Sequence, residues 1–156
     1  MLPYRRILCP IDFSEPSYSA LQRAEELARH FGAELCVAHV IPTLPGPHLF
    51  ADPPVATSFD VSLYQQELAR NAEKMLKEVV SHRISPEVRT RDLVTTGEAA
   101  SEILRIAGQE HADLIVIASH GLTGWRRLVF GSVAERVVRL APCPVLTIVA
   151  PHAEEG

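Results

Sequence analysis

The chain has 156 residues, of which 47% are hydrophobic and 22% charged, so it can bury one substantial core, and disordered, collagen-like and coiled-coil classes are excluded. Its formal net charge of −4 gives no general electrostatic attraction to nucleic acid or to an anionic membrane, and we expect neither partner. The first apolar segment is too short for a signal-peptide core or a transmembrane helix, which predicts a cytoplasmic protein without membrane insertion.

Five apolar, β-branched runs are predicted to be strands, and several are nearly continuous, as in strands buried on both faces. They cover residues 7–11, 34–41, 88–94, 114–118 and 145–149. The segments between them have helical periodicity, for example from Ala20 to Phe31 and across roughly residues 60–82. Strands that alternate with helices predict a doubly wound, Rossmann- or flavodoxin-like α/β fold with a parallel five-stranded sheet and helices on both faces.

The organisation is predicted to be one domain over residues 1–150, followed by a short tail over 151–156. Residues 42–58 break the alternation, because they contain five prolines and no periodic pattern. A loop of this length is either a surface excursion or a lid over a site at the carboxyl edge of the sheet, and the sequence leaves both open.

Cysteines and histidines give little sign of a metal or catalytic site. Cys9, Cys36 and Cys143 lie in or beside apolar runs without CxxC spacing, so we expect reduced thiols in the core. His39 lies within the second strand and is interpreted as a hydrogen-bonded core histidine rather than a ligand.

The most informative segment follows the fourth strand, where Gly121, Gly124 and Gly131 fall between that strand and the next helix. Backbone N–H groups in such a loop, helped by the positive end of a helix, can converge on a phosphate. Ser132 followed by Glu135 also forms a capping box, so capping and phosphate contact are both open for Ser132. Arg126 and Arg127 would add positive charge to this loop or simply be solvated.

A second element lies at the end of the first strand. Ligands of doubly wound sheets bind beyond the strand ends where the strand order reverses. Asp12 leaves a buried strand there and could accept hydrogen bonds from sugar hydroxyls, while Ser14 is expected to be the N-cap of the first helix. Val40, near the end of the second strand, could offer an apolar wall and backbone groups to a base.

These motifs resemble the universal stress protein family in its single-domain form, in the same order and over essentially the whole chain. The resemblance includes Pro10 to Ser14, His39-Val40, Ser119 to Gly121 and Gly131 to Glu135. ATP-binding members carry G-x2-G-x9-G-[ST], which Gly121, Gly131 and Ser132 match, whereas Ala118 replaces the first glycine. The Ala118 methyl group could weaken binding by crowding the ribose or the phosphates.

The resemblance implies strand order 3-2-1-4-5 and a bound ATP. Adenine is then expected near Pro10, Ile11 and Val40, and the ribose near Asp12. Phosphates are expected on Ser119, His120 and Gly121 and on Gly131, Ser132, Val133 and Ala134, and Ala118 is expected to contact the nucleotide beside them. Mg²⁺ or Mn²⁺ would be held mainly by phosphate oxygens and water, because the chain offers no carboxylate cage.

The resemblance further implies a homodimer, in which the edge strand from Val145 to Val149 pairs with its copy. An uncovered apolar edge strand is also an aggregation hazard on physical grounds. The expected function is a stress-response regulatory protein that acts as an ATP-dependent binding switch and is not primarily an enzyme. The alternatives are a chaperone-like dimer that binds no nucleotide, which Ala118 favours, and a slow ATPase, for which His120 is the nearest candidate residue.

Overall fold

The computed structural model describes residues 2–44, 60–120 and 130–149 of the chain. Within these residues five strands and four helices alternate, in the order β1 (Arg6–Pro10), α1 (Glu15–Phe31), β2 (Glu34–Ile41), α2 (Val61–Arg83), β3 (Thr90–Thr96), α3 (Ala99–Gln109), β4 (Leu114–Ala118), α4 (Ser132–Leu140) and β5 (Val145–Ile148). Every strand pairing is parallel, and the order is β3-β2-β1-β4-β5. The predicted doubly wound fold and its strand order are confirmed.

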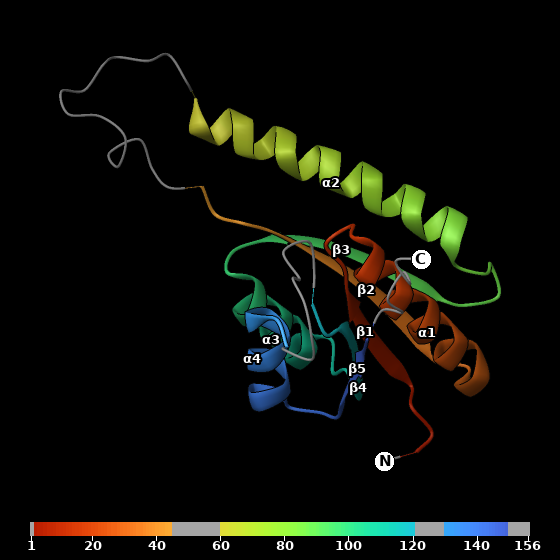
Figure 1. The fold of residues 1–156 in the computed structure, drawn as a ribbon. Coiled ribbons are helices and arrows are strands. Elements are labelled where there is room, and N and C mark those ends of the chain that lie inside the picture. Colours follow the sequence, from red (N-terminus) through yellow and green to blue (C-terminus); the bar gives the residue numbers. More distant parts are fainter. Residues whose placement is uncertain (1, 45–59, 121–129, 150–156) are drawn as a thin grey trace, which may run out of the picture.

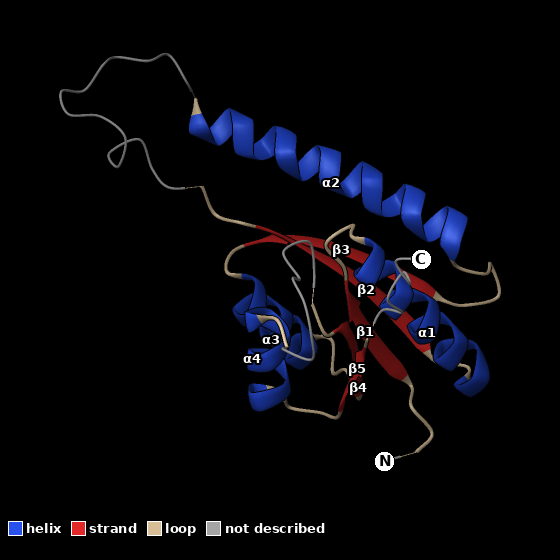
Figure 2. Ribbon diagram, viewed as in Figure 1, coloured by secondary structure: helices blue, strands red, loops and turns tan. Residues whose placement is uncertain are grey.

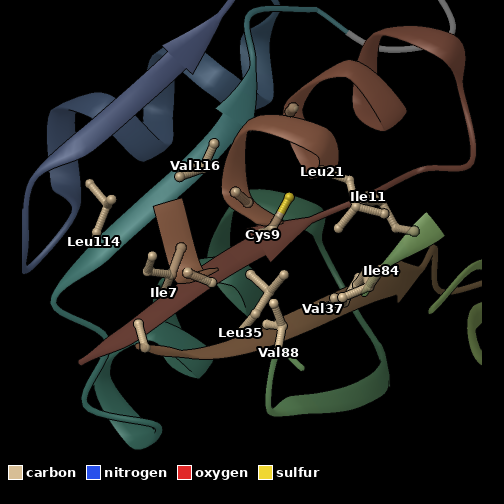
Figure 3. Close-up of a cluster of buried hydrophobic side chains, with 14 of the residues drawn as sticks. Ile7, Cys9, Ile11, Leu21, Leu35, Val37, Ile84, Val88, Leu114 and Val116 are labelled. Carbon is tan, nitrogen blue, oxygen red and sulfur yellow. The ribbon is translucent and has the colours of Figure 1, made fainter. Parts of the chain in front are cut away.

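The helices cover both faces of the sheet, with α1 and α2 on one face and α3 and α4 on the other (Figures 1 and 2). Alternate residues of each strand supply the two cores. Ile7 and Cys9 of β1, and Ile11 directly after it, project into the core beneath α1 and α2 (Figure 3). Leu8, between Ile7 and Cys9, joins the core beneath α3 and α4.

The helix boundaries follow local signals. The hydroxyl oxygen of Ser14 accepts a hydrogen bond from Ser17 N at 3.3 Å, which confirms Ser14 as the N-cap of α1. Gly32 ends α1 with φ +64°, a left-handed conformation that glycine adopts without strain. Asp60 caps α2, and its Oδ1 accepts from Ser62 N and Leu63 N at 3.0 and 3.2 Å.

The third strand begins two residues later than predicted, at Thr90 rather than at residue 88. Val88 is apolar because it is buried in the core, but its N–H donates to Ser85 O at 3.0 Å in a turn before the strand. Burial therefore extends beyond the backbone pairing at this point.

The cysteine prediction holds for two of three residues. Cys9 and Cys36 are buried, whereas Cys143 is only half-buried between α4 and β5. Among the described residues, no helix is both long enough and apolar enough to cross a membrane.

The amino ends of β1 and β4 are joined through Asp113. Its carboxylate accepts hydrogen bonds from Arg5 N at 2.9 Å and from Arg6 N at 3.2 Å, and its own N–H donates to Arg6 O at 3.0 Å. The two strands then pair only at Ile7 with Leu114 and at Leu8 with Ile115. Beyond those pairs, toward the carboxyl edge, the two strands separate.

Candidate functional site

A pocket of about 320 Å³ lies at the carboxyl edge of the sheet, where β1 and β4 separate. This is the position where the strand order reverses, which is the usual ligand site of doubly wound folds. Its walls come from the ends of β1, β2 and β4 and the first turns of α1, α3 and α4, through Pro10, Ile11, Asp12, Ser17, Val40, Pro42, Ala99, Ile103, Ile117, Ala118, His120, Gly131, Ser132, Val133 and Ala134. The pocket therefore brings together the ends of strands far apart in the sequence.

Most of the site residues predicted from the sequence meet in this pocket. Ten of them line it, namely Pro10, Ile11, Asp12, Val40, Ala118, His120, Gly131, Ser132, Val133 and Ala134. Ser119 is not among the lining residues, although its neighbours Ala118 and His120 are, and Gly121 lies outside the described residues. The candidate lid at 42–58 also lies mostly outside them, as do Arg126 and Arg127.

Five lining residues were not predicted, namely Ser17, Pro42, Ala99, Ile103 and Ile117. Ile103 and Ile117 belong to the core beneath α3 and α4, so their apolar pattern signals burial and conceals their second role as pocket wall. Pro42 directly follows β2, and Ala99 is the first residue of α3, so proximity to a strand or helix end was the signal that could have found them.

The β1–α1 turn fixes the acidic side of the pocket. Asp12 Oδ1 accepts a hydrogen bond from Ser14 N at 3.1 Å and another from the Ser14 hydroxyl. The same hydroxyl oxygen caps α1 through Ser17 N. Ser14 therefore links the Asp12 carboxylate to the first turn of α1 by hydrogen bonds, which hold the carboxylate in position. Asp12 is the one carboxylate among the described lining residues.

The segment after β4 is held at both of its described ends. Ser119 N donates to Ile148 O at 2.9 Å, and Gly131 N donates to Ser119 O at 2.7 Å. The Ser119 hydroxyl lies 2.8 Å from His120 Nδ1 and is thereby engaged beside the pocket rather than in it. These bonds place Gly131 next to the carboxyl end of β4.

The capping-box prediction for Ser132 is wrong. Gly131, with φ −60° and ψ 152°, is the N-cap of α4, and no side chain bonds the cap, so Ser132 is the first helical residue. The N–H groups of Ser132, Val133 and Ala134 have no acceptor within the helix. These residues line the pocket, so the α4 N-terminus presents backbone donors and a partial positive charge at its wall.

The pocket is therefore divided by chemistry. Val40, Ile103 and Ile117 contribute apolar lining, Asp12 contributes a carboxylate, and the first turn of α4 contributes backbone donors. The described residues contain no group of three His, Cys, Asp or Glu side chains that could hold a metal ion. An apolar surface for a base, an acceptor for hydroxyls and donors for an anion are the three features that a nucleotide requires.

Comparison with known proteins gives a consistent result over the same length of chain. Residues 3–148 match the family model described as the universal stress protein family. Universal stress protein MJ0531 of Methanocaldococcus jannaschii is 34% identical over 97% of this chain and 85% of its own length. Universal stress protein YxiE of Bacillus subtilis is 30% identical over 93% of this chain and 99% of its own.

Solved structures show the same fold. The structure of MJ0577 superposes with a TM-score of 0.78 at 25% identity and covers 96% of this chain and 99% of its own. The Archaeoglobus fulgidus universal stress protein in complex with dAMP has a TM-score of 0.61 at 25% identity, covering 95% and 99% of the two chains. Since the family model spans nearly the whole chain, the protein belongs to the universal stress protein family.

Proposed function

We propose that the protein binds an adenine nucleotide, ATP in the first instance, in the pocket between β1 and β4. The observation that carries the proposal is that one cavity is bordered by both Asp12 and the first turn of α4. The dAMP complex of the archaeal relative supports adenine-nucleotide chemistry at this fold.

Each part of the nucleotide has a matching wall. The base would lie against Pro10, Ile11 and Val40, where apolar surface and backbone groups are available. The ribose hydroxyls would donate to Asp12. The phosphates would accept from the N–H groups of Ser132, Val133 and Ala134. Ser119 and His120 are further candidate contacts, and Gly121, which is proposed with them, lies outside the described residues.

A divalent cation fits this site only as a companion of the phosphates. Because the described residues form no cluster of metal ligands, Mg²⁺ or Mn²⁺ would be held by phosphate oxygens and water. The contribution of this chain is to bind and orient the nucleotide, and in the proposed role the bound state acts as a switch for a partner.

We also propose a homodimer through the β5 edge. β5 ends the sheet, and Leu146 and Val149 are 39% and 60% exposed. Pairing with the same strand of a second copy would cover these side chains and the unpaired backbone groups of the edge.

Titration calorimetry with ATP, AMP and GTP in the presence of Mg²⁺ tests the binding proposal. We expect ATP to bind, and Asp12→Asn to weaken it about tenfold because a charged acceptor for the ribose is lost. Asn at position 12 retains an Oδ1 acceptor for Ser14, so the turn itself should persist. Asp92→Asn, at an exposed carboxylate of β3 outside the pocket, is the matched control. Absence of binding at millimolar ATP would refute the proposal.

A further inference from the structure

His39 lies on β2 and does not line the pocket. Successive side chains of a strand point to opposite faces, so His39 points away from its neighbour Val40, which lines the pocket. His39 Nδ1 is 2.9 Å from Ile11 O. A carbonyl oxygen only accepts, so Nδ1 must carry the proton and donate it to Ile11, the residue directly after β1.

Phe13 makes the second contact. Its ring and the His39 ring lie with centroids 4.4 Å apart at an interplanar angle of 41°. Phe13 has φ +61°, a left-handed conformation that is unfavourable for a bulky side chain. Such a conformation persists only where surrounding contacts determine it, and it concentrates at functional sites.

Asp12 lies between the two residues that His39 contacts. On one side Ile11 is held to β2 twice, by Ile11 N donating to Ala38 O at 2.8 Å and by the His39 ring. On the other side Phe13 packs against the same ring. The two residues that flank Asp12 in the chain therefore both contact His39, while Ser14 holds the carboxylate itself.

We propose that His39 is a positioning residue for the nucleotide site, which holds the strained Asp12–Phe13 turn so that the carboxylate meets the ribose. This inference rests on the proposed function and assigns a role to a residue that does not line the pocket. It predicts that the effect of losing His39 depends on the hydroxyl groups of the ligand.

The test compares ATP with 2′,3′-dideoxy-ATP, which lacks both ribose hydroxyls. His39→Phe keeps an aromatic ring against Phe13 and removes the donor. We expect it to weaken ATP binding about tenfold, in proportion to one hydrogen bond to a charged group, and to leave 2′,3′-dideoxy-ATP within about twofold. His39→Asn, whose amide nitrogen takes the place of Nδ1, should recover part of the ATP affinity.

A matched control separates positioning from loss of stability. Ile7→Val removes a buried methyl group at the amino end of β1, at the opposite end of the strand from Ile11 (Figure 3). It should lower stability and leave both affinities unchanged. Equal losses of both ligands in His39→Phe, or no loss of either, would overturn the inference.

NMR of the ligand-free protein distinguishes this inference from the proposed function. Long-range ¹H–¹⁵N spectra should show the proton on His39 Nδ1, and the amide signals of Asp12 and Phe13 should shift in His39→Phe but not in Ile7→Val. If the wild-type protein binds no nucleotide, the proposed function fails. These spectra then decide the positioning role, since an unprotonated Nδ1 or unchanged turn signals would overturn it.

Discussion

At the scale of single residues, a substitution of Gly131 should affect ligand binding without affecting folding. Its φ is −60°, and an added Cβ would meet His120 Cα and Ser119 O at 3.5 Å, an ordinary contact distance. Gly131→Ala should therefore fold with its free energy of unfolding changed by less than about 1 kcal/mol. Since the new methyl group stands at the pocket wall, we expect calorimetry to show weaker ATP binding.

Gly108→Ala is the control for this substitution. Gly108 lies within α3, and an added Cβ would meet nothing within 4 Å. The change should stabilise the protein by roughly 0.5–1 kcal/mol through helix propensity and leave the ATP affinity unchanged. An unaltered affinity in Gly131→Ala would place the phosphates away from the start of α4.

The thiols give a second prediction at this scale. Burial raises the pKa of Cys36 to about 12 and also raises the pKa of Cys9 and of half-buried Cys143. Because the thiolate is the reactive form, the native protein should react slowly with a disulfide reagent at pH 8, with Cys143 first, and Cys143→Ser should remove that phase. Complete labelling of Cys9 in the native state would contradict the burial.

The same pKa shifts set the sign of a pH dependence. Unfolding returns Cys36 from a pKa of about 12 to its ordinary value near 8.5. Above that ordinary value the unfolded chain binds fewer protons than the folded chain. The titration of Cys36 therefore leaves the free energy of unfolding unchanged below about pH 8.5 and lowers it as the pH rises from there toward 12.

At the scale of elements, the junction between β3 and α3 depends on Gly97. Its φ is +157°, and an added Cβ would stand 2.7 Å from Glu102 Cγ. Glu102 in turn accepts a hydrogen bond from the Thr95 hydroxyl at 2.7 Å, so its displacement disturbs both elements. We expect Gly97→Ala to lower the free energy of unfolding by about 1–3 kcal/mol in denaturant titrations.

A double-mutant cycle identifies the cause. Glu102→Ala removes the Cγ that the new methyl group would strike, so the cost of Gly97→Ala should be smaller in that background. The part that remains measures the backbone conformation alone. Additive effects of the two substitutions would show that steric conflict contributes nothing.

The elements themselves were largely predictable, because buried strands and apolar helix stripes have distinct periods. Fine boundaries were less so. Val88 is buried in the core but lies outside the strand. Ser132 and Glu135 have the spacing of a capping box, although Gly131 occupies the N-cap position. A buried valine is compatible with a strand or with a turn that packs on the core, and a serine at a helix start is compatible with the N-cap or with the first helical position. The residue type alone therefore does not distinguish the two structures.

Lining residues of the candidate site were predictable where their chemistry differs from that of the core, as at Asp12 and Gly131. Ile103 and Ile117 could not be recognised as pocket wall, since buried core and ligand surface select the same side chains. His39 was expected to be a hydrogen-bonded histidine, and it is one, but its partner across the sheet is set by the register of β1 and β2.

At the scale of the whole molecule, the proposed dimer makes the edge strand the decisive element. Leu146→Lys places a charge on β5, which should prevent pairing with a second copy because lysine protects sheet edges. We expect sedimentation velocity to show a dimer for the wild type and a monomer for this variant. Val138→Lys, at a 47% exposed position of α4, is the control and should remain dimeric. A monomeric wild type at micromolar concentration would refute the dimer.

The Asp113 junction has a mechanical consequence for the molecule. It fastens β1 to β4 at their amino ends, and only two residue pairs follow before the strands part. The two strands are thus joined at their amino ends, and the pocket lies at their carboxyl ends, beyond the last pair. Because the last β1–β4 pair lies before the pocket, a ligand can occupy the pocket without displacing a backbone hydrogen bond between these two strands.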